Sequence, residues 1–375
     1  MYLAIREMRF AKVRYSLIAA IMLLVAFLVL FVTGLAQGLA YDNASSIQNM
    51  KATHFIMEKE SNQRLTRSQV GERVREKASA IAGEENAQPL GVKQTTVTAD
   101  GTARKLDVAV LAVNPKSWLM PAVTEGIAID SQSRGQAVVD DRLKASGIGI
   151  GTAIADQASG LKWTVSGFVS DESFSHSPAI FVSERDWLLL QGKTVPSRLE
   201  GSEAASTSYN AIAVKADKAK VRQLEAALPP GAEVVAKSAA VSAIPGYKEE
   251  QGSLLMMIVF LFVISAFVLM VFFYVITVQK SSQFGILKAI GMRTASLAGS
   301  VTLQVLLLSA GSLMISVLLV RAMEELLPSG MPFQLPAATL LLTCGAFMAM
   351  SLMGSLLSVW KVARIDALDA IGRTG

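Results

Sequence analysis

Four stretches of this sequence contain no Asp, Glu, Lys or Arg, and each exceeds the roughly 20 apolar residues that a helix needs to cross a bilayer. The composition agrees, because 52% of the residues are hydrophobic and only 17% are charged, which is too apolar for an ordinary soluble protein. We therefore predict four transmembrane helices, within residues 15–40, 251–279, 294–320 and 326–360. Three prolines, the last of them Pro336, interrupt the front of the fourth stretch, so its helix is expected to begin near Ala337.

The distribution of Lys and Arg predicts the orientation of these helices, because basic residues concentrate at the cytoplasmic ends of spans. They stand before the first span, after the second and after the fourth: Arg6, Arg9, Lys12 and Arg14; Lys280, Lys288 and Arg293; Lys361, Arg364 and Arg373. We expect a multi-pass plasma-membrane protein with both termini in the cytoplasm. The expected segments are spans at 15–41, 251–279, 294–320 and 337–360, an extracytoplasmic domain at 42–250, a cytoplasmic segment at 280–293, an outer loop at 321–336 and a cytoplasmic tail at 361–375.

The first 14 residues mix apolar and basic side chains. We interpret them as an amphipathic helix on the inner membrane surface, although a basic flank that only fixes the topology would look similar. The first apolar stretch is longer than a typical signal-peptide core and is followed by a poor cleavage site, so we expect it to remain as a span.

Residues 42–250 are predicted to form an α+β domain. Runs rich in Val and Ile, bounded by Gly, Asp, Pro or Ser, predict strands at 105–113, 161–170, 178–184, 210–216 and 232–238. Helical spacing appears at 67–82 and 218–228, and the glycine-rich "GIGIGT" of 147–152 indicates a turn that leads into a strand. The expected fold is therefore an α-helical membrane protein with an α+β domain between its first and second spans.

Several kinds of chemistry are excluded or disfavoured. The sequence contains no G-x-x-x-x-G-K-[ST] phosphate loop, no H-E-x-x-H and no G-x-S-x-G, so we expect no catalytic residue, no intrinsic cofactor and no ATP hydrolysis by this chain. One cysteine, Cys344, and two histidines are too few for the usual zinc sites. The acidic pairs at 140–141 and 171–172 are interpreted as solvated surface carboxylates. No nucleic-acid partner is expected.

The short basic segment between the second and third predicted spans is distinctive. Phe284, Leu287 and Ile290 recur at helical spacing, and Gly285 and Gly291 stand near the two ends. Such a helix could dock into a groove on a partner protein, or it could be an ordinary interfacial turn.

Here the sequence "QFGILKAIGMR" resembles the coupling helix of FtsX/MacB-like ABC transporter permeases. The run "GQAVVDDRLKASGIGIGTAI", the run "LKWTVSGFVSD" and the tail "ARIDALDAI" resemble other segments of the same family. The resemblance implies that the segment docks on a separate ATPase dimer through Phe284, Gly285, Ile286, Leu287, Lys288, Ile290 and Gly291. Gln283 and Asp366 stand where many members have Glu and Pro, which puts in doubt a salt bridge from position 283.

The runs "LAIREMRFAKVRYSLI", "LFVTGLAQGLA" and "FIMEKES" further resemble the permeases of Gram-positive hemin-efflux ABC transporters. This implies a homodimer that uses two ATPase subunits to expel haem from the membrane by mechanotransmission, with membrane lipid as its surroundings. Two alternatives remain open. One is a permease for peptide antibiotics or lipoproteins, and the other is a regulator of a cell-wall hydrolase that transports nothing.

If haem is the substrate, its iron needs ligands such as His, Met or a carboxylate. Alternation along "THFIMEKE" would put His54 and Glu58 on one strand face. Met256 and Met257 open the second predicted span, with Phe260 one turn beyond Met256. We expect Glu58 and Met256 as axial candidates, then Met257, with His54 in reserve and Phe260 against the porphyrin. The alternative is that the methionines only fill space between helices and that Glu58 is a solvated acid.

Overall fold

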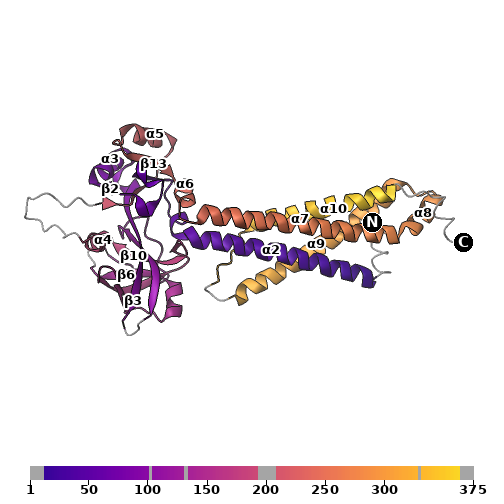
Figure 1. Cartoon of the computed structure of the whole chain (residues 1–375), viewed down its shortest axis with the longest axis horizontal. Helices are drawn as coiled ribbons and strands as arrows, with labels where there is room; N and C mark the ends of the chain where they lie inside the picture. The colour runs from indigo at the N-terminus through magenta and orange to yellow at the C-terminus, as the bar shows by residue number, and fades with distance from the viewer. Residues whose placement is uncertain (1–11, 101–103, 131–133, 193–207, 328–330, 364–375) are drawn as a thin grey trace, which may run out of the picture. The chain divides into compact units, whose positions relative to one another are not determined.

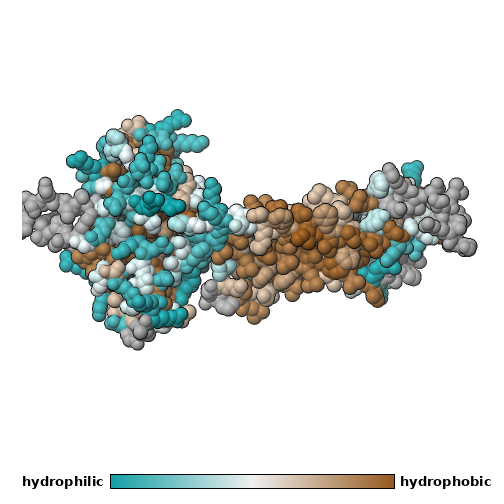
Figure 2. All heavy atoms as spheres, in the orientation of Figure 1, coloured by the Kyte–Doolittle hydropathy of each residue, from teal (hydrophilic) through white to brown (hydrophobic). Residues whose placement is uncertain are grey.

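The computed structural model describes residues 12–100, 104–130, 134–192, 208–327 and 331–363 (Figure 1). They fall into two units: a helical unit, made of the described parts of Met1–Gly38 and Gly252–Gly375, and a sheet unit, made of the described parts of Leu39–Gln251. The amphipathic helix expected at 1–14 and the tail expected at 361–375 lie almost entirely outside the described residues. On the face in Figure 2, apolar residues gather over the helical unit and hydrophilic residues over the sheet unit.

Four of the described helices are long and apolar enough to cross a membrane, judged by length and composition. They are α2 (Lys12–Gln48), α7 (Tyr247–Gln279), α9 (Thr294–Leu326) and α10 (Ala337–Ala363), and the short helix α8 (Ser281–Ala289) stands between α7 and α9. The start of α10 at Ala337 confirms the expectation drawn from Pro336.

The helical unit is held by an apolar cluster to which all four long helices contribute. From α2 come Ile18, Met22 and Leu30, and they meet Phe273 of α7 and Phe347 of α10. Serines of α9 add polar links between helices: Ser312 and Ser316 donate to the backbone carbonyls of Ala19 and Leu23, at 3.2 and 2.9 Å. Such small polar residues let helices approach closely in a membrane. Helix α7 takes the least part in this packing. Only 11% of its most apolar stretch is buried, against 39% of the corresponding stretches of α2 and α9.

Two glycines of α2 make room for the segment before α10. A Cβ placed on Gly38 would lie 2.6 Å from Phe333 Cα and closer still to the Pro332 carbonyl, and one on Gly34 would overlap the Phe333 ring. The Gln334 amide donates to the Gly34 carbonyl at 3.1 Å. Close approach of two backbones requires glycine at this crossing.

The sheet unit is built on one large mixed sheet. Its strand order is β13-β1-β12-β3-β4-β10-β6-β8-β5, with β7 pairing β3 and β8, β9 pairing β10, and a separate pair β11-β2. The strands are β1 (His54–Glu58), β2 (Val70–Gly71), β3 (Ala87–Ala99), β4 (Lys105–Val113), β5 (Glu125–Gly126), β6 (Gln136–Asp140), β7 (Ala153–Asp156), β8 (Lys162–Val169), β9 (Ser173–Phe174), β10 (Ser177–Ser183), β11 (Ser208–Tyr209), β12 (Ala211–Val214) and β13 (Ala232–Ala236). Four helices, α3 (Glu72–Ala82), α4 (Glu184–Leu190), α5 (Lys218–Ala227) and α6 (Lys237–Ser242), complete the unit.

Both faces of the sheet are buried, so adjacent residues of a strand enter different clusters. In β1, Ile56 joins the cluster that includes residues of α3 and α5, while Met57 joins the cluster that includes residues of α6 and the end of α2. The predicted strands at 105–113, 161–170, 178–184, 210–216 and 232–238 are confirmed as β4, β8, β10, β12 and β13. The predicted helices at 67–82 and 218–228 correspond to α3 and α5, and the turn at 147–152 leads into β7.

Candidate functional sites: the α8 segment and two buried polar networks

Helix α8 is a short element with defined ends. Lys280 is the one residue between α7 and α8: its amide caps α7 by donating to the Ile276 carbonyl at 3.1 Å, and its carbonyl accepts from Phe284 N at 3.0 Å. At the other end Gly291 takes a positive φ of 97°, and Gly291 N donates to the Lys288 carbonyl at 3.0 Å. A glycine in this conformation is a common way to end a helix.

The inner face of α8 is anchored in the helical unit. Phe284 is 1% exposed and packs with Leu297 and Val301 of α9 and Val362 of α10. Lys288 Nζ donates to the Ala363 carbonyl at the end of α10, at 3.1 Å. This face therefore holds the helix to its neighbours and is not offered to a partner.

The outer face of α8 presents apolar side chains that the described helical unit does not cover. Ile286 is 44% exposed and Ile290 is 78% exposed. The structure thus divides the predicted docking residues: Phe284 and Gly285 point inward, Leu287 and Lys288 are half-buried, and Ile286, Ile290 and Gly291 are exposed. A row of exposed apolar residues on a short helix can fill a groove of another protein.

A buried polar triad lies at the junction of α7 and α8. Lys280 Nζ donates to Tyr15 Oη at 2.6 Å, and Tyr15 Oη donates to Gln304 Oε1 at 2.7 Å. The lysine nitrogen also lies 5.0 Å from the centre of the Tyr15 ring. All three side chains are almost fully buried. We call Lys280, Tyr15 and Gln304 the Lys280 triad.

The sequence analysis did not identify this triad. Lys280 directly follows the last residue of the predicted span 251–279, which is the usual place of an exposed basic flank. Tyr15 and Gln304 lie far from it in the chain, so only the packing of α2 and α9 against α7 brings them together. The available signal was a glutamine inside a predicted span that contains no charged residue, because a buried amide needs a polar partner.

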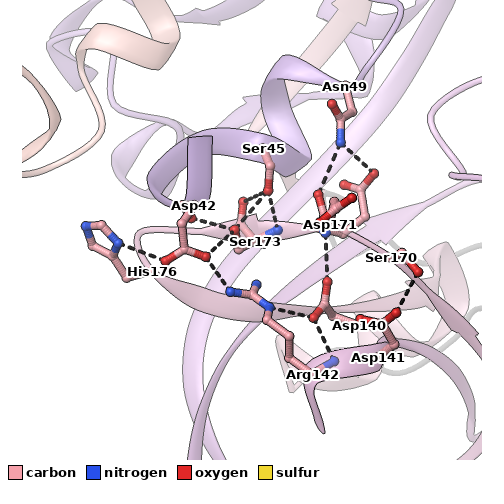
Figure 3. A network of polar contacts seen from close by, with 11 residues as sticks. Asp42, Ser45, Asn49, Asp140, Asp141, Arg142, Ser170, Asp171, Ser173 and His176 are labelled. Carbon is pink, nitrogen blue, oxygen red and sulfur yellow. Dashed lines mark hydrogen bonds and ion pairs between the residues drawn. The ribbon is translucent and has the colours of Figure 1, made fainter. Parts of the chain in front are cut away.

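A second polar network lies in the sheet unit, between the end of α2 and the sheet (Figure 3). Asp42 accepts from Arg142, whose Nε also donates to Asp140 Oδ1 at 2.8 Å. The hydroxyls of Ser45 and Ser173 lie 2.8 Å apart. These contacts connect the last turns of α2 to the segments around β6 and β9. We call this set the Asp42 network.

Three further contacts extend the Asp42 network. His176 lies between two carboxylates, with Nδ1 3.0 Å from Asp42 Oδ2 and Nε2 3.2 Å from Glu250 Oε2. Asn43 Nδ2 also donates to Glu250 Oε2, at 2.8 Å. Glu250 belongs to the first turns of α7. Residues at the end of α2 and at the start of α7 therefore share one network.

The acidic pairs of the sheet unit are not all solvated, so that interpretation was wrong for two residues. Asp140 is fully buried and Glu172 is 4% exposed. Burial, together with the nearby Asp140 and Asp171 carboxylates, raises the pKa of Glu172 to about 8, although a hydrogen bond from Asn49 Nδ2 at 3.1 Å opposes that shift. The fold tolerates these acids because Asp140 is paired with Arg142 and Glu172 stays protonated at neutral pH.

The residues predicted to bind haem belong to both units. His54 and Glu58 lie on one face of β1, half-buried, and the Glu58 carboxylate accepts from Gln69 N at 3.1 Å. Met256, Met257 and Phe260 belong to α7 and are 56%, 47% and 60% exposed. Cys344 is half-buried in α10 against the apolar cluster of the helical unit. Among the described residues no group of three or more His, Cys, Asp or Glu is placed to hold a metal ion.

Comparison with known proteins finds permeases, both by family and by individual relatives. Residues 255–367 match the family described as FtsX-like permease C-terminal. Two proteins named hemin transport system permease protein HrtB are similar over 99% of this chain and 99% of their own lengths. The one from Staphylococcus haemolyticus is 31% identical, and the one from Staphylococcus epidermidis is 30% identical. The crystal structure of the periplasmic region of MacB from Actinobacillus actinomycetemcomitans is 10% identical and covers 50% of this chain and 90% of its own, with a TM-score of 0.35, too low to support an argument.

Proposed function

This chain belongs to the family of FtsX-like permeases that includes the hemin transport permeases, and from that membership we propose that it is the membrane subunit of an ABC exporter that expels haem. The observation that carries the proposal is the similarity to hemin transport permeases along 99% of both chains, which extends across the sheet unit as well as the helices. A match confined to the last three helices would have supported only a permease of undefined substrate.

We propose that the energy comes from a separate ATPase dimer that docks on α8. The sequence has no phosphate loop of its own. The docking surface is the outer face of α8, with Ile286 and Ile290 as its apolar contacts, while Phe284 and Lys288 fix the helix to α9 and α10. ATP binding would close the partner dimer and displace α8, and the displacement would pass through the long helices to the sheet unit.

The proposed topology places both termini in the cytoplasm and residues 42–250 outside. It rests on the basic residues at the ends of the spans and on the hydrophilic residues that gather over the sheet unit on the face in Figure 2. We further propose that two copies of the chain form a homodimer, so that each contributes ligands to haem.

For the haem ligands we retain Glu58 and Met256 as axial candidates, then Met257 and His54, with Phe260 packing on the porphyrin. Two observations support them. The three α7 side chains turn toward the surroundings of the helical unit, where an apolar substrate dissolved in the bilayer would meet them. Glu58 is only partly buried, so its carboxylate is not closed off from a ligand.

The test of the function uses the full chain reconstituted with its ATPase in vesicles. Hemin should be exported only with ATP, and export should stop when the ATPase cannot hydrolyse ATP. ATP-dependent export of an antibiotic peptide without export of hemin would refute the haem assignment and would favour the peptide permease.

The test of the ligands is the absorbance spectrum of hemin bound to the purified protein. Glu58→Ala and Met256→Ala should each shift the Soret band and weaken binding. Met314→Ala, at a similarly exposed methionine of α9, is the matched control and should change nothing. If Glu58→Ala, Met256→Ala and Met257→Ala all keep the wild-type spectrum, the iron is held elsewhere.

A further inference from the structure

We propose that a cavity of the sheet unit, beside the end of α2, binds an apolar molecule that carries a carboxylate. The cavity has a volume of about 490 Å³, within the range of about 300–1,000 Å³ that small-molecule sites occupy. Three segments line it: residues 46–51 at and after the end of α2, the loop 118–124 between β4 and β5, and residues 170–172 between β8 and β9. None of the haem ligands proposed above lines it, so this is a second binding site, beyond the proposed function.

Much of the lining is apolar. Five apolar side chains contribute: Met50, Trp118, Leu119, Met120 and Pro121. Met50 and Leu119 are 4% and 2% exposed, so the sheet unit holds them in place. The indole N–H of Trp118 donates to the Glu85 carbonyl at 2.7 Å, which fixes the ring. The apolar body of a ligand would therefore find a preformed surface and would leave water when it binds.

Glu172 supplies a hydrogen-bond donor to this cavity. Its Oε1 accepts from Asn49 Nδ2 at 3.1 Å, and its Oε2 has no hydrogen bond to any described residue. Burial, together with the Asp140 and Asp171 carboxylates, raises the pKa of Glu172 to about 8. At neutral pH the carboxyl is therefore protonated and can donate its O–H. Asp140 is itself paired with Arg142, and Asp171 does not line the cavity.

Two further groups favour an anionic acceptor. The Lys51 side chain is exposed, and no acidic side chain among the described residues pairs with it. Ser46 is 1% exposed, and its Oγ has no partner among the described residues. The carbonyl one turn earlier, on Asp42, already accepts from Ser173 Oγ. Because Ser46 lines the cavity, a change of its side-chain rotamer lets the hydroxyl donate to a ligand there.

The three donors and the apolar lining together define the ligand. A carboxylate accepts from the Glu172 carboxyl and the Ser46 hydroxyl, and its charge is offset by the Lys51 ammonium. Hemin and free fatty acids both combine an apolar body with a carboxylate, so both have the required chemistry. A cation would be repelled by Lys51 and would bind better once Glu172 is ionised, above pH 8. The direction of the pH dependence therefore separates the two charges.

The test is protection of a thiol in the cavity of the purified full chain. In a Cys344→Ser background, Ala122→Cys places a thiol on an exposed lining residue, and Ala158→Cys places one at an exposed position outside the cavity. Iron-free protoporphyrin IX should slow the reaction of Ala122→Cys with a thiol reagent and leave that of Ala158→Cys unchanged. The dimethyl ester of the same porphyrin has no carboxylate and should not protect.

Variants of the lining test each donor. Lys51→Gln should raise the half-protecting concentration of the porphyrin about two- to fivefold, the range for an exposed charge pair. Ser46→Ala should raise it about three- to tenfold, the range for one hydrogen bond. Lys105→Gln, at an exposed lysine that does not line the cavity, is the matched control and should change nothing.

The dependence on pH tests Glu172. Between pH 7 and 9 the half-protecting concentration should rise about tenfold in the otherwise unaltered chain, because only the protonated carboxyl, with its pKa of about 8, donates. Glu172→Gln keeps a donor that does not ionise, so it should bind equally at both pH values. A flat dependence without that substitution, tighter binding at pH 9, or equal protection by the ester would overturn the proposal.

The source of the carboxylate is decided by a second probe. Protection by palmitate and not by protoporphyrin would support the site and assign it to fatty acids, whereas protection by neither would overturn it. The assay contains no iron and no ATP. A failure of hemin export, or of the proposed iron ligands, would therefore leave its result unchanged.

Discussion

At the scale of single residues, Glu172 is the most unusual acid in the sheet unit. Its carboxyl is buried and has a pKa of about 8, against 4.5 for an unperturbed glutamate. The unfolded chain loses this proton near its ordinary pKa, while the folded chain keeps it up to about pH 8. The unfolded state therefore binds fewer protons between those values, and the free energy of unfolding falls as pH rises through that window.

The variant Glu172→Gln should remove that dependence, because the amide is similar in shape and never ionises. Above pH 8 it should be more stable than the wild type by on the order of a few kcal/mol. The measurement is the thermal unfolding midpoint of the purified full chain between pH 5 and 9. Glu60→Gln, at an exposed acid, should keep the wild-type slope. An unchanged slope in Glu172→Gln would mean that another group dominates.

At the scale of elements, the two faces of α8 should respond differently to substitution. Ile290→Asp places a charge on the outer face, so co-purification with the ATPase should be lost while thermal stability stays near wild type. Phe284→Ala empties a buried site, which costs about 3–5 kcal/mol in protein cores, so stability should fall. If Ile290→Asp retains the ATPase at the wild-type ratio, docking does not use this face.

Some elements could be predicted from the sequence and others could not, for identifiable reasons. The strand β4 is a run of Val, Ala and Leu ending at a turn, and its predicted bounds match the structure. The longer strand β3 was not predicted, because it contains Pro89 and Gly91, and proline and glycine are uncommon inside strands. Tertiary packing overrides that preference: a Cβ on Gly91 would lie 2.6 Å from the Trp187 ring.

Among the candidate sites, too, those formed by neighbouring residues could be predicted from the sequence, and those formed by distant residues could not. The proposed docking residues of α8 could be named from the sequence because they are contiguous in the chain. The Lys280 triad and the buried acids Asp140 and Glu172 were not, because each depends on contacts between distant segments. Which side of α8 faces outward also required the structure, since Phe284 and Ile290 recur at helical spacing but only Ile290 is exposed.

At the scale of the whole molecule, the proposed topology can be tested without any substrate. In a Cys344→Ser background, Ala158→Cys in the sheet unit should react with a membrane-impermeant thiol reagent in intact cells. Ser282→Cys in α8 should react only after the membrane is opened, because α8 is expected in the cytoplasm. Both positions are exposed, so accessibility alone does not distinguish them. The reverse pattern would invert the orientation.

The close contact of Gly34 and Gly38 with Pro332 and Phe333 limits which substitutions can survive at these two positions. Every codon change that replaces glycine adds at least a methyl group. At position 34 that group meets a phenyl ring, which can rotate away, but at position 38 it meets main-chain atoms, which cannot. Natural variation among close relatives should therefore spare position 38 more strictly than position 34, and a random mutant library selected for hemin tolerance should recover changes at Gly34 before any at Gly38.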